Sequence, residues 1–141
     1  MLLLVEDNPD DVELTLLAMR QDGPTDTTVV VRDGAEALDF VFHRGCFSDR
    51  VPAETPDAVL LDIKLPLVDG IEVLRSIRAD ARTRHLPVVM LTSSAQASDL
   101  TACYDLGVNS YIVKPVDVDA FFTTVRQIGR YWTVLNHPEA V

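Results

Sequence analysis

Five short apolar runs alternate along the chain with longer segments whose apolar residues recur at helical spacing. The runs are continuous rather than alternating in polarity, which is typical of strands covered on both faces of a parallel sheet. They span Leu2–Val5, Thr28–Val31, Ala58–Leu61, residues 87–91 and Ser110–Val113. Strict alternation of strand and helix predicts an α/β fold, a doubly wound five-stranded parallel sheet with helices on both faces.

Each run is followed by a segment with the periodicity of an amphipathic helix. Asn8 and Pro9 suit the N-cap and first helical positions of the first helix, and Gly107 suits the position just after the fourth. The expected helices cover residues 10–21, 35–42, 70–79, 97–106 and a fifth from residue 117.

Composition limits the class of protein. The 141 residues, 48% of them hydrophobic, suffice for one domain with a substantial core. A formal net charge of -10 would repel nucleic-acid phosphates, so we expect no nucleic-acid partner. Cys46 and Cys103 lack metal-ligand spacing, which indicates free thiols in a reducing compartment. The apolar start, residues 1–5, is too short for a signal peptide or membrane span, so we expect a cytoplasmic protein.

Candidate site residues follow four of the five runs. Glu6 and Asp7 follow the first, Asp62 the third, Thr92 the fourth and Lys114 the fifth. One such acid alone is more often a solvated loop residue or a helix cap. The set, however, falls at the carboxyl ends of the strands, where open α/β sheets bind ligands. We therefore expect a functional site at this edge.

The residue types at this edge suit phosphoryl chemistry. Neighbouring carboxylates repel one another, and a hard divalent cation such as Mg²⁺ relieves that repulsion through oxygen ligands. An aspartate can attack phosphorus and form an acyl phosphate. Lys114 and the cation would neutralise phosphoryl oxygens, and Thr92 could donate a hydrogen bond to one of them.

The ordered set of motifs resembles the receiver domain of two-component response regulators, over nearly the whole chain. The motifs are Val5-Glu6-Asp7-Asn8, Leu61-Asp62, Leu65-Pro66, Asp69-Gly70, Leu91-Thr92-Ser93 and Lys114-Pro115. Thr92 and Lys114 follow Asp62 by 30 and 52 residues, as in that family. The resemblance implies a (βα)5 flavodoxin-like receiver fold and a phosphorylated switch, rather than an enzyme with a turnover reaction.

The resemblance also implies residue roles. Asp62 would be the phosphoacceptor, and Asp7, Asp62 and the backbone carbonyl of Lys64 would bind Mg²⁺, with Glu6 acting through metal-bound water. Thr92 and Lys114 would contact the phosphoryl group, with a cis peptide joining Lys114 to Pro115. Tyr111 would be an aromatic switch that turns inward as Thr92 shifts; a tyrosine that merely closes the sheet edge is the alternative. Lys64 departs from the family's usual residue types, which leaves the dephosphorylation rate open.

A narrower resemblance points to phytochrome-associated single-domain response regulators. It rests on five stretches: Asp33-Gly34-Ala35-Glu36-Ala37-Leu38-Asp39-Phe40, Leu60-Leu61-Asp62-Ile63-Lys64-Leu65-Pro66, Leu91-Thr92-Ser93-Ser94, Asn109-Ser110-Tyr111 and Tyr131-Trp132. It implies that the partner histidine kinase is a light sensor, possible examples being bacteriophytochromes.

The carboxyl end carries more apolar surface than a receiver core needs. The stripe of the fifth helix should cover the sheet by about Ile128, yet Tyr131, Trp132 and Leu135 continue it. We expect a receiver domain at 1–130 and an extension at 131–141 that forms a homodimer interface, with packing inside the chain as the alternative. No DNA-binding module follows, so we expect output through protein contacts. The loop at 43–56 is either a solvated surface loop or a kinase or dimer contact.

Two other functions use similar architecture or chemistry. A haloacid-dehalogenase-like phosphatase places its nucleophile after the first strand with a second Asp two residues later, whereas Lys64 stands two residues after Asp62. A flavodoxin-like cofactor binder needs a Gly-, Ser- and Thr-rich phosphate loop after the first strand. Here that position holds acids, which would repel a flavin phosphate.

Overall fold

The computed structural model describes residues 1–20, 28–49, 55–93 and 95–113. Its five strands form one sheet in the order β2-β1-β3-β4-β5. They are β1 (Leu2–Val5), β2 (Thr28–Val31), β3 (Ala58–Leu61), β4 (Val88–Thr92) and β5 (Ser110–Val113), and every pairing is parallel. The strand predictions are confirmed, with β4 beginning and ending one residue later than expected.

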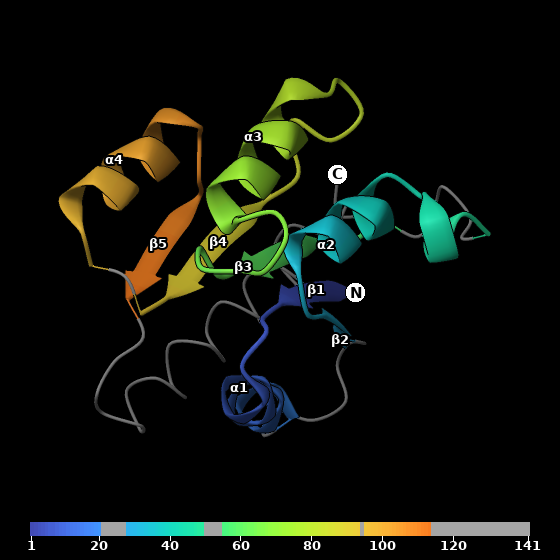
Figure 1. Ribbon diagram of the computed structural model, residues 1–141, viewed down its shortest axis with the longest axis horizontal. Helices are drawn as coiled ribbons and strands as arrows, with labels where there is room; N and C mark the ends of the chain where they lie inside the picture. The colour runs from blue at the N-terminus through green and yellow to red at the C-terminus, as the bar shows by residue number, and fades with distance from the viewer. Residues whose placement is uncertain (21–27, 50–54, 94, 114–141) are drawn as a thin grey trace, which may run out of the picture.

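Helices cover both faces of the sheet. Figure 1 shows α1 (Pro9–Arg20) on one side and α2 (Gly34–Val41), α3 (Gly70–Ala79) and α4 (Ala97–Asp105) on the other. The doubly wound architecture predicted from the sequence is therefore confirmed. The expected fifth helix, from residue 117, lies outside the described residues.

The continuous apolar runs are explained by the two layers of helices. Successive residues of a strand point to opposite faces, so Leu3 and Val5 join the larger cluster with α2 and α3, while Leu4 packs with Val12 of α1. All four residues of β1 and of β3 are buried. Burying an aliphatic side chain of this size contributes about 1.5–3 kcal/mol, so a polar residue within these strands would be costly.

The two cysteines lie in different surroundings. Cys46 is exposed and Cys103 is buried, and both are free thiols, as expected from the sequence. Burial, with a smaller effect from Asp99, raises the pKa of the Cys103 thiol to about 11. Cys103 therefore stays neutral at physiological pH and serves as a small apolar residue of the core.

Helix ends follow the expected capping chemistry. The Asn8 side-chain oxygen accepts hydrogen bonds from the backbone N–H groups of Asp10 and Asp11, at 2.9 and 3.3 Å. At the end of α4, Gly107 donates its N–H to Tyr104 at 3.0 Å and has a φ of 78°. Both termini predicted from the sequence are confirmed.

Phe47 packs against the core in the segment after α2, whereas its neighbours Gly45, Cys46 and Ser48 are exposed. Residues Gly45–Phe47 form a 3₁₀ turn, and the Phe47 ring meets Phe40 edge to face at 5.0 Å between centroids. Residues 50–54 lie outside the described part, so a docking role for this loop stays a prediction.

None of the helices described is long and apolar enough to cross a membrane.

Candidate functional site

The register of the sheet brings the predicted site residues to one edge. Val5 of β1 lies opposite Leu61 of β3, so the residues that follow these strands, Glu6 and Asp62, are neighbours. The Asp62 N–H donates to the Val5 carbonyl at 3.2 Å, and the Glu6 N–H donates to the Val31 carbonyl at 3.1 Å. From β1 the chain crosses to β2 on one side of the sheet and then to β3 on the other, so the strand order reverses at β1. Such sheets bind ligands at the carboxyl ends of the strands beside this reversal.

Asp62 sits at the end of the central strand with little exposure. The whole residue is only 7% exposed. One carboxylate oxygen accepts the backbone N–H of Lys64 at 3.4 Å, a long contact that orients the carboxylate weakly. Asp62 is thus a carboxylate at the sheet edge in a largely desolvated setting.

Glu6 has a structural contact that the sequence did not reveal. It is 3% exposed, and its carboxylate accepts the backbone N–H of Asn8 at 3.3 Å. Since Asn8 in turn caps α1, Glu6 holds the turn that leads from β1 into that helix. Asp7, between them, is exposed at the rim. No sequence pattern predicts this contact, because it depends on how the turn folds back.

Thr92 lies on the strand next to Asp62. Leu61 pairs with Met90, which places Thr92, the last residue of β4, one residue beyond the level of Asp62. Thr92 is fully buried. It also pairs with Val113 of β5, the residue just before Lys114. Lys114 itself, and the cis peptide expected after it, lie outside the described residues.

Two glycines hold the loop that follows Asp62. A Cβ added to Gly70 would lie 2.0 Å from the Asp62 carbonyl oxygen, so only glycine lets α3 begin this close to the site. A Cβ added to Gly34 would lie 1.7 Å from the Val68 carbonyl oxygen, and the Gly34 N–H donates to Pro66 at 3.3 Å. The loop is therefore clamped between α2 and the end of β3. Gly70 belongs to the Asp69-Gly70 motif recognised in the sequence, whereas the close approach of Gly34 to this loop was not predicted.

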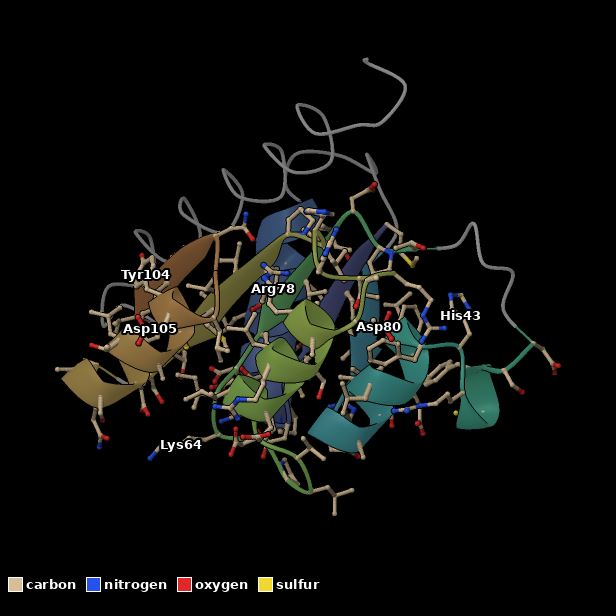
Figure 2. All side chains as sticks on the ribbon, turned by 90° about the horizontal axis from the view of Figure 1, so that it is seen from above. His43, Lys64, Arg78, Asp80, Tyr104 and Asp105 are labelled. Atoms are coloured by element: carbon tan, nitrogen blue, oxygen red, sulfur yellow. The ribbon has the colours of Figure 1, made fainter. Side chains whose placement is uncertain are left out.

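The acids at this edge suit a hard cation that needs few protein ligands. In the described part of the chain, no three His, Cys, Asp or Glu side chains could hold a metal ion by themselves. Mg²⁺ usually takes one or two carboxylates and completes its shell with water, carbonyl or phosphate oxygens. Asp7, exposed, and Asp62, at the same ends of the strands, are carboxylates of the kind that this requirement calls for, and Figure 2 shows the Lys64 side chain reaching away from the domain.

Tyr111 occupies an intermediate position in β5. It pairs with Met90 of β4, is half-buried and packs against the larger core cluster. This placement is compatible with both roles considered for it, a switch and an edge residue. The expected interface residues, Tyr131, Trp132 and Leu135, lie outside the described part of the chain.

Comparison with known proteins decides the family. A model of the response regulator receiver domain matches residues 2–126. The chain belongs to this family. Members are signalling switches rather than enzymes in the ordinary sense, and membership leaves the phosphatase and the flavodoxin-like cofactor binder without support.

Solved receivers of similar structure include phytochrome response regulators. The phosphorylated cyanobacterial phytochrome response regulator RcpA superposes with a TM-score of 0.87 and 36% identity over 95% of this receiver and 94% of RcpA. The bacteriophytochrome response regulator AtBRR is 48% identical, with a TM-score of 0.76 and 96% of each chain covered. The resemblance to phytochrome response regulators is thereby confirmed.

Two further relatives bear on the metal and on the range of partners. Rcp1 of Synechocystis is 33% identical over 93% of this receiver and 87% of Rcp1. Its Mn²⁺-bound form superposes with a TM-score of 0.85 over 94% of each chain. The probable methanogenesis regulatory protein FilR2 of Methanothrix harundinacea is 41% identical over 96% of this receiver and 84% of FilR2. The relatives therefore include regulators outside phytochrome signalling.

Proposed function

We propose that this receiver is the phosphoacceptor of a two-component system and that a histidine kinase phosphorylates it on Asp62. The observation that carries the proposal is the place of Asp62. It ends the central strand at the point of strand-order reversal, 7% exposed, with buried Thr92 on the adjacent strand. An aspartate in this position has the limited water access that an acyl phosphate needs to persist.

The proposed step is a phosphoryl transfer between two side chains. A carboxylate oxygen of Asp62 attacks the phosphorus of a phosphohistidine on the kinase. An O–P bond forms and the P–N bond breaks, and the electron pair of that bond stays on the imidazole nitrogen, which takes up a proton. The Thr92 hydroxyl would donate a hydrogen bond to a phosphoryl oxygen, and Lys114 would offset the phosphoryl charge.

A Mg²⁺ ion would be held by Asp7, Asp62 and the Lys64 carbonyl, with Glu6 acting through a bound water. When bound, Mg²⁺ supplies positive charge that offsets the repulsion between the carboxylates and an incoming phosphoryl group. The Mn²⁺-bound form described for Rcp1 supports a divalent cation in a receiver of this kind. The contact between Glu6 and Asn8 supports an indirect role for Glu6, because that carboxylate already holds the start of α1.

The proposed partner is a bacteriophytochrome-type histidine kinase. Similarity to RcpA and AtBRR, both described as phytochrome response regulators, supports it. FilR2, described as a methanogenesis regulator, supports the broader proposal of a histidine kinase without naming its stimulus.

Free thiols and an ATP-dependent kinase partner fit a cytoplasmic location. Tyr111 would report phosphorylation by moving inward with Thr92, and output would pass through protein contacts.

Acetyl phosphate tests the proposal without a kinase. Incubation with acetyl phosphate and Mg²⁺, followed by borohydride trapping and mass spectrometry, should label Asp62 alone. Asp62→Asn should abolish the labelling. Asp69→Asn is the matched control: Asp69 caps α3 by accepting the Glu72 N–H at 3.0 Å, and asparagine caps equally well, so labelling should persist. Wild-type labelling in Asp62→Asn would exclude Asp62 as the acceptor.

A further inference from the structure

One large apolar side chain stands out on the loop between β3 and α3. Leu67 is 82% exposed, whereas the other exposed large hydrophobic residues in the described part of the chain reach 53% at most, at Tyr104. The neighbours Leu65 and Val68 are partly buried and pack against the core. Leu67 therefore adds little to the stability of the fold through burial.

Leu67 also holds an unfavourable backbone conformation. Its φ is 68°, in the left-handed region, where the Cβ of a residue other than glycine is crowded. The Val68 N–H donates to the Pro66 carbonyl at 2.8 Å, which closes a tight γ-turn with Leu67 at its tip. Strained positions of this kind concentrate at functional sites. The strain at Leu67 has no compensation in side-chain burial within the domain.

The loop presents Leu67 rigidly. The Pro66 carbonyl accepts a second hydrogen bond, from the Gly34 N–H at 3.3 Å, and the Gly70 N–H donates to the Ile63 carbonyl at 2.7 Å. Gly34 and Gly70 pass so close to the loop that neither has room for a Cβ. An apolar side chain on a preorganised turn loses little backbone freedom when it is bound, and this favours its use as a contact.

Leu67 lies within reach of any protein that reacts with Asp62. Leu67 is three residues from Gly70, a distance of at most roughly 11 Å for an extended chain. Gly70 itself lies against the Asp62 carbonyl. A standard protein interface covers about 800 Å² on each partner, equivalent to a disc of roughly 16 Å radius. A protein centred on Asp62 would therefore cover Leu67, whereas a small phosphodonor would not touch it.

We infer that Leu67 is an apolar anchor for the protein that donates the phosphoryl group, and that it inserts into an apolar recess beside the donor's phosphohistidine. This inference rests on the proposed phosphorylation of Asp62. Leu67 takes no part in the chemical step. It selects a protein donor of complementary surface and brings it into register with the acceptor carboxylate.

Two substitutions separate contact from folding. Leu67→Gly removes the side chain and relieves the strain, and Leu67→Asn replaces it with a polar residue that tolerates a positive φ. The protein donor is the autophosphorylated histidine kinase that transfers fastest to the wild type among those of the source organism. For both variants, kcat/KM with this kinase should fall about tenfold or more. Phosphorylation by acetyl phosphate should stay within about twofold, and the Tm of Leu67→Gly should not fall.

Tyr104→Gln is the matched control, because it removes an exposed apolar side chain from the last turn of α4. That turn leads to the amino end of β5, opposite the site, so transfer from the kinase should be unchanged. Equal kinase transfer to wild type and to both Leu67 variants would overturn the inference. Equal slowing with both donors would overturn it too, by showing that Leu67 positions Asp62. Failure of acetyl phosphate to label wild-type Asp62 would instead refute the proposed function.

Discussion

At the scale of single residues, the acids of the site differ in what surrounds them. Glu6 and Asp62 are nearly inaccessible, at 3% and 7% exposure, while Asp7 is exposed. Glu6 is bonded to the Asn8 backbone and so takes part in building the start of α1. Asp7 can therefore change with less consequence for the fold than Glu6, and this makes it the better position for testing the cation.

Asp7→Ala should weaken Mg²⁺ binding by about tenfold or more and slow phosphorylation by acetyl phosphate. The physical reason is the loss of one of the two carboxylates proposed to bind the ion directly. Isothermal titration with Mg²⁺ measures the affinity, and circular dichroism checks that the fold is retained. Asp33→Asn, a change in the cap of α2, is the control. The same affinity in Asp7→Ala as in wild type would show that the cation binds elsewhere.

The sequence indicated most of these residues because they directly follow strands. Asp62 and Thr92 could be assigned to one edge as soon as the runs were taken as parallel strands. The contact of Glu6 with Asn8 and the positive φ of Leu67 could not be assigned, since both depend on turn geometry that residue types do not determine. Lys114, expected beside them, follows the last described residue.

At the scale of elements, α3 runs from the carboxyl ends of the strands to their amino ends. It begins at Gly70, against the Asp62 carbonyl, and near its end Arg78 reaches the loops that precede β4 and β5. The Arg78 guanidinium, labelled in Figure 2, donates to the Leu86 carbonyl at 2.7 Å, to the Gly107 carbonyl at 2.9 Å and to the Asn109 side-chain oxygen at 3.1 Å. Burial lowers the pKa of Arg78. Arg78 thus ties α3 to two loops far away in the sequence.

Arg78→Met should lower the free energy of unfolding by about 1–2 kcal/mol, because a side chain of similar length leaves the Leu86 and Gly107 carbonyls without the Arg78 donor, while the Asn109 side-chain oxygen keeps the Val88 N–H. Urea denaturation measures the change. Arg75→Met on the same helix is the matched control: Arg75 is exposed and pairs with Glu72, so its loss should cost no more than about 0.5 kcal/mol. Equal stability of the two variants would contradict the bridging role of Arg78.

Elements were the level at which the sequence was most informative. Continuous apolar runs gave the strands to within one residue, since burial on both faces leaves few positions for polar residues. The Arg78 contacts could not be inferred, because they join residues up to 31 positions apart and two of the three acceptors are backbone carbonyls, which every residue carries.

At the scale of the whole molecule, the receiver architecture accounts for the described residues, and the carboxyl end carries the remaining prediction. We expect a receiver domain at 1–130 and an extension at 131–141. In this extension Tyr131, Trp132 and Leu135 would pair with a second copy about a two-fold axis. Burial of one such side chain contributes about 2 kcal/mol, and aromatic anchors often dominate interfaces.

Sedimentation at micromolar concentration should show a dimer that Trp132→Ala combined with Leu135→Ala weakens by about tenfold or more while the circular dichroism spectrum is kept. Repeating the measurement after acetyl phosphate treatment shows whether the phosphoryl group changes the equilibrium. A monomeric wild type would contradict the interface. A double variant that unfolds would place these side chains in the core.

The strand order also has a consequence for how the chain is made. β1 is synthesised before the other four strands, yet in the folded sheet it lies between β2 and β3. Leu2, for example, pairs with Thr28 on one side and with Ala58 on the other. A ribosome adds about 5–20 residues per second, so β3 follows β1 by roughly 3–11 s. During that interval one edge of an apolar strand has no partner, a condition that favours aggregation and binding by chaperones. With only four residues, β1 offers a short edge to such encounters.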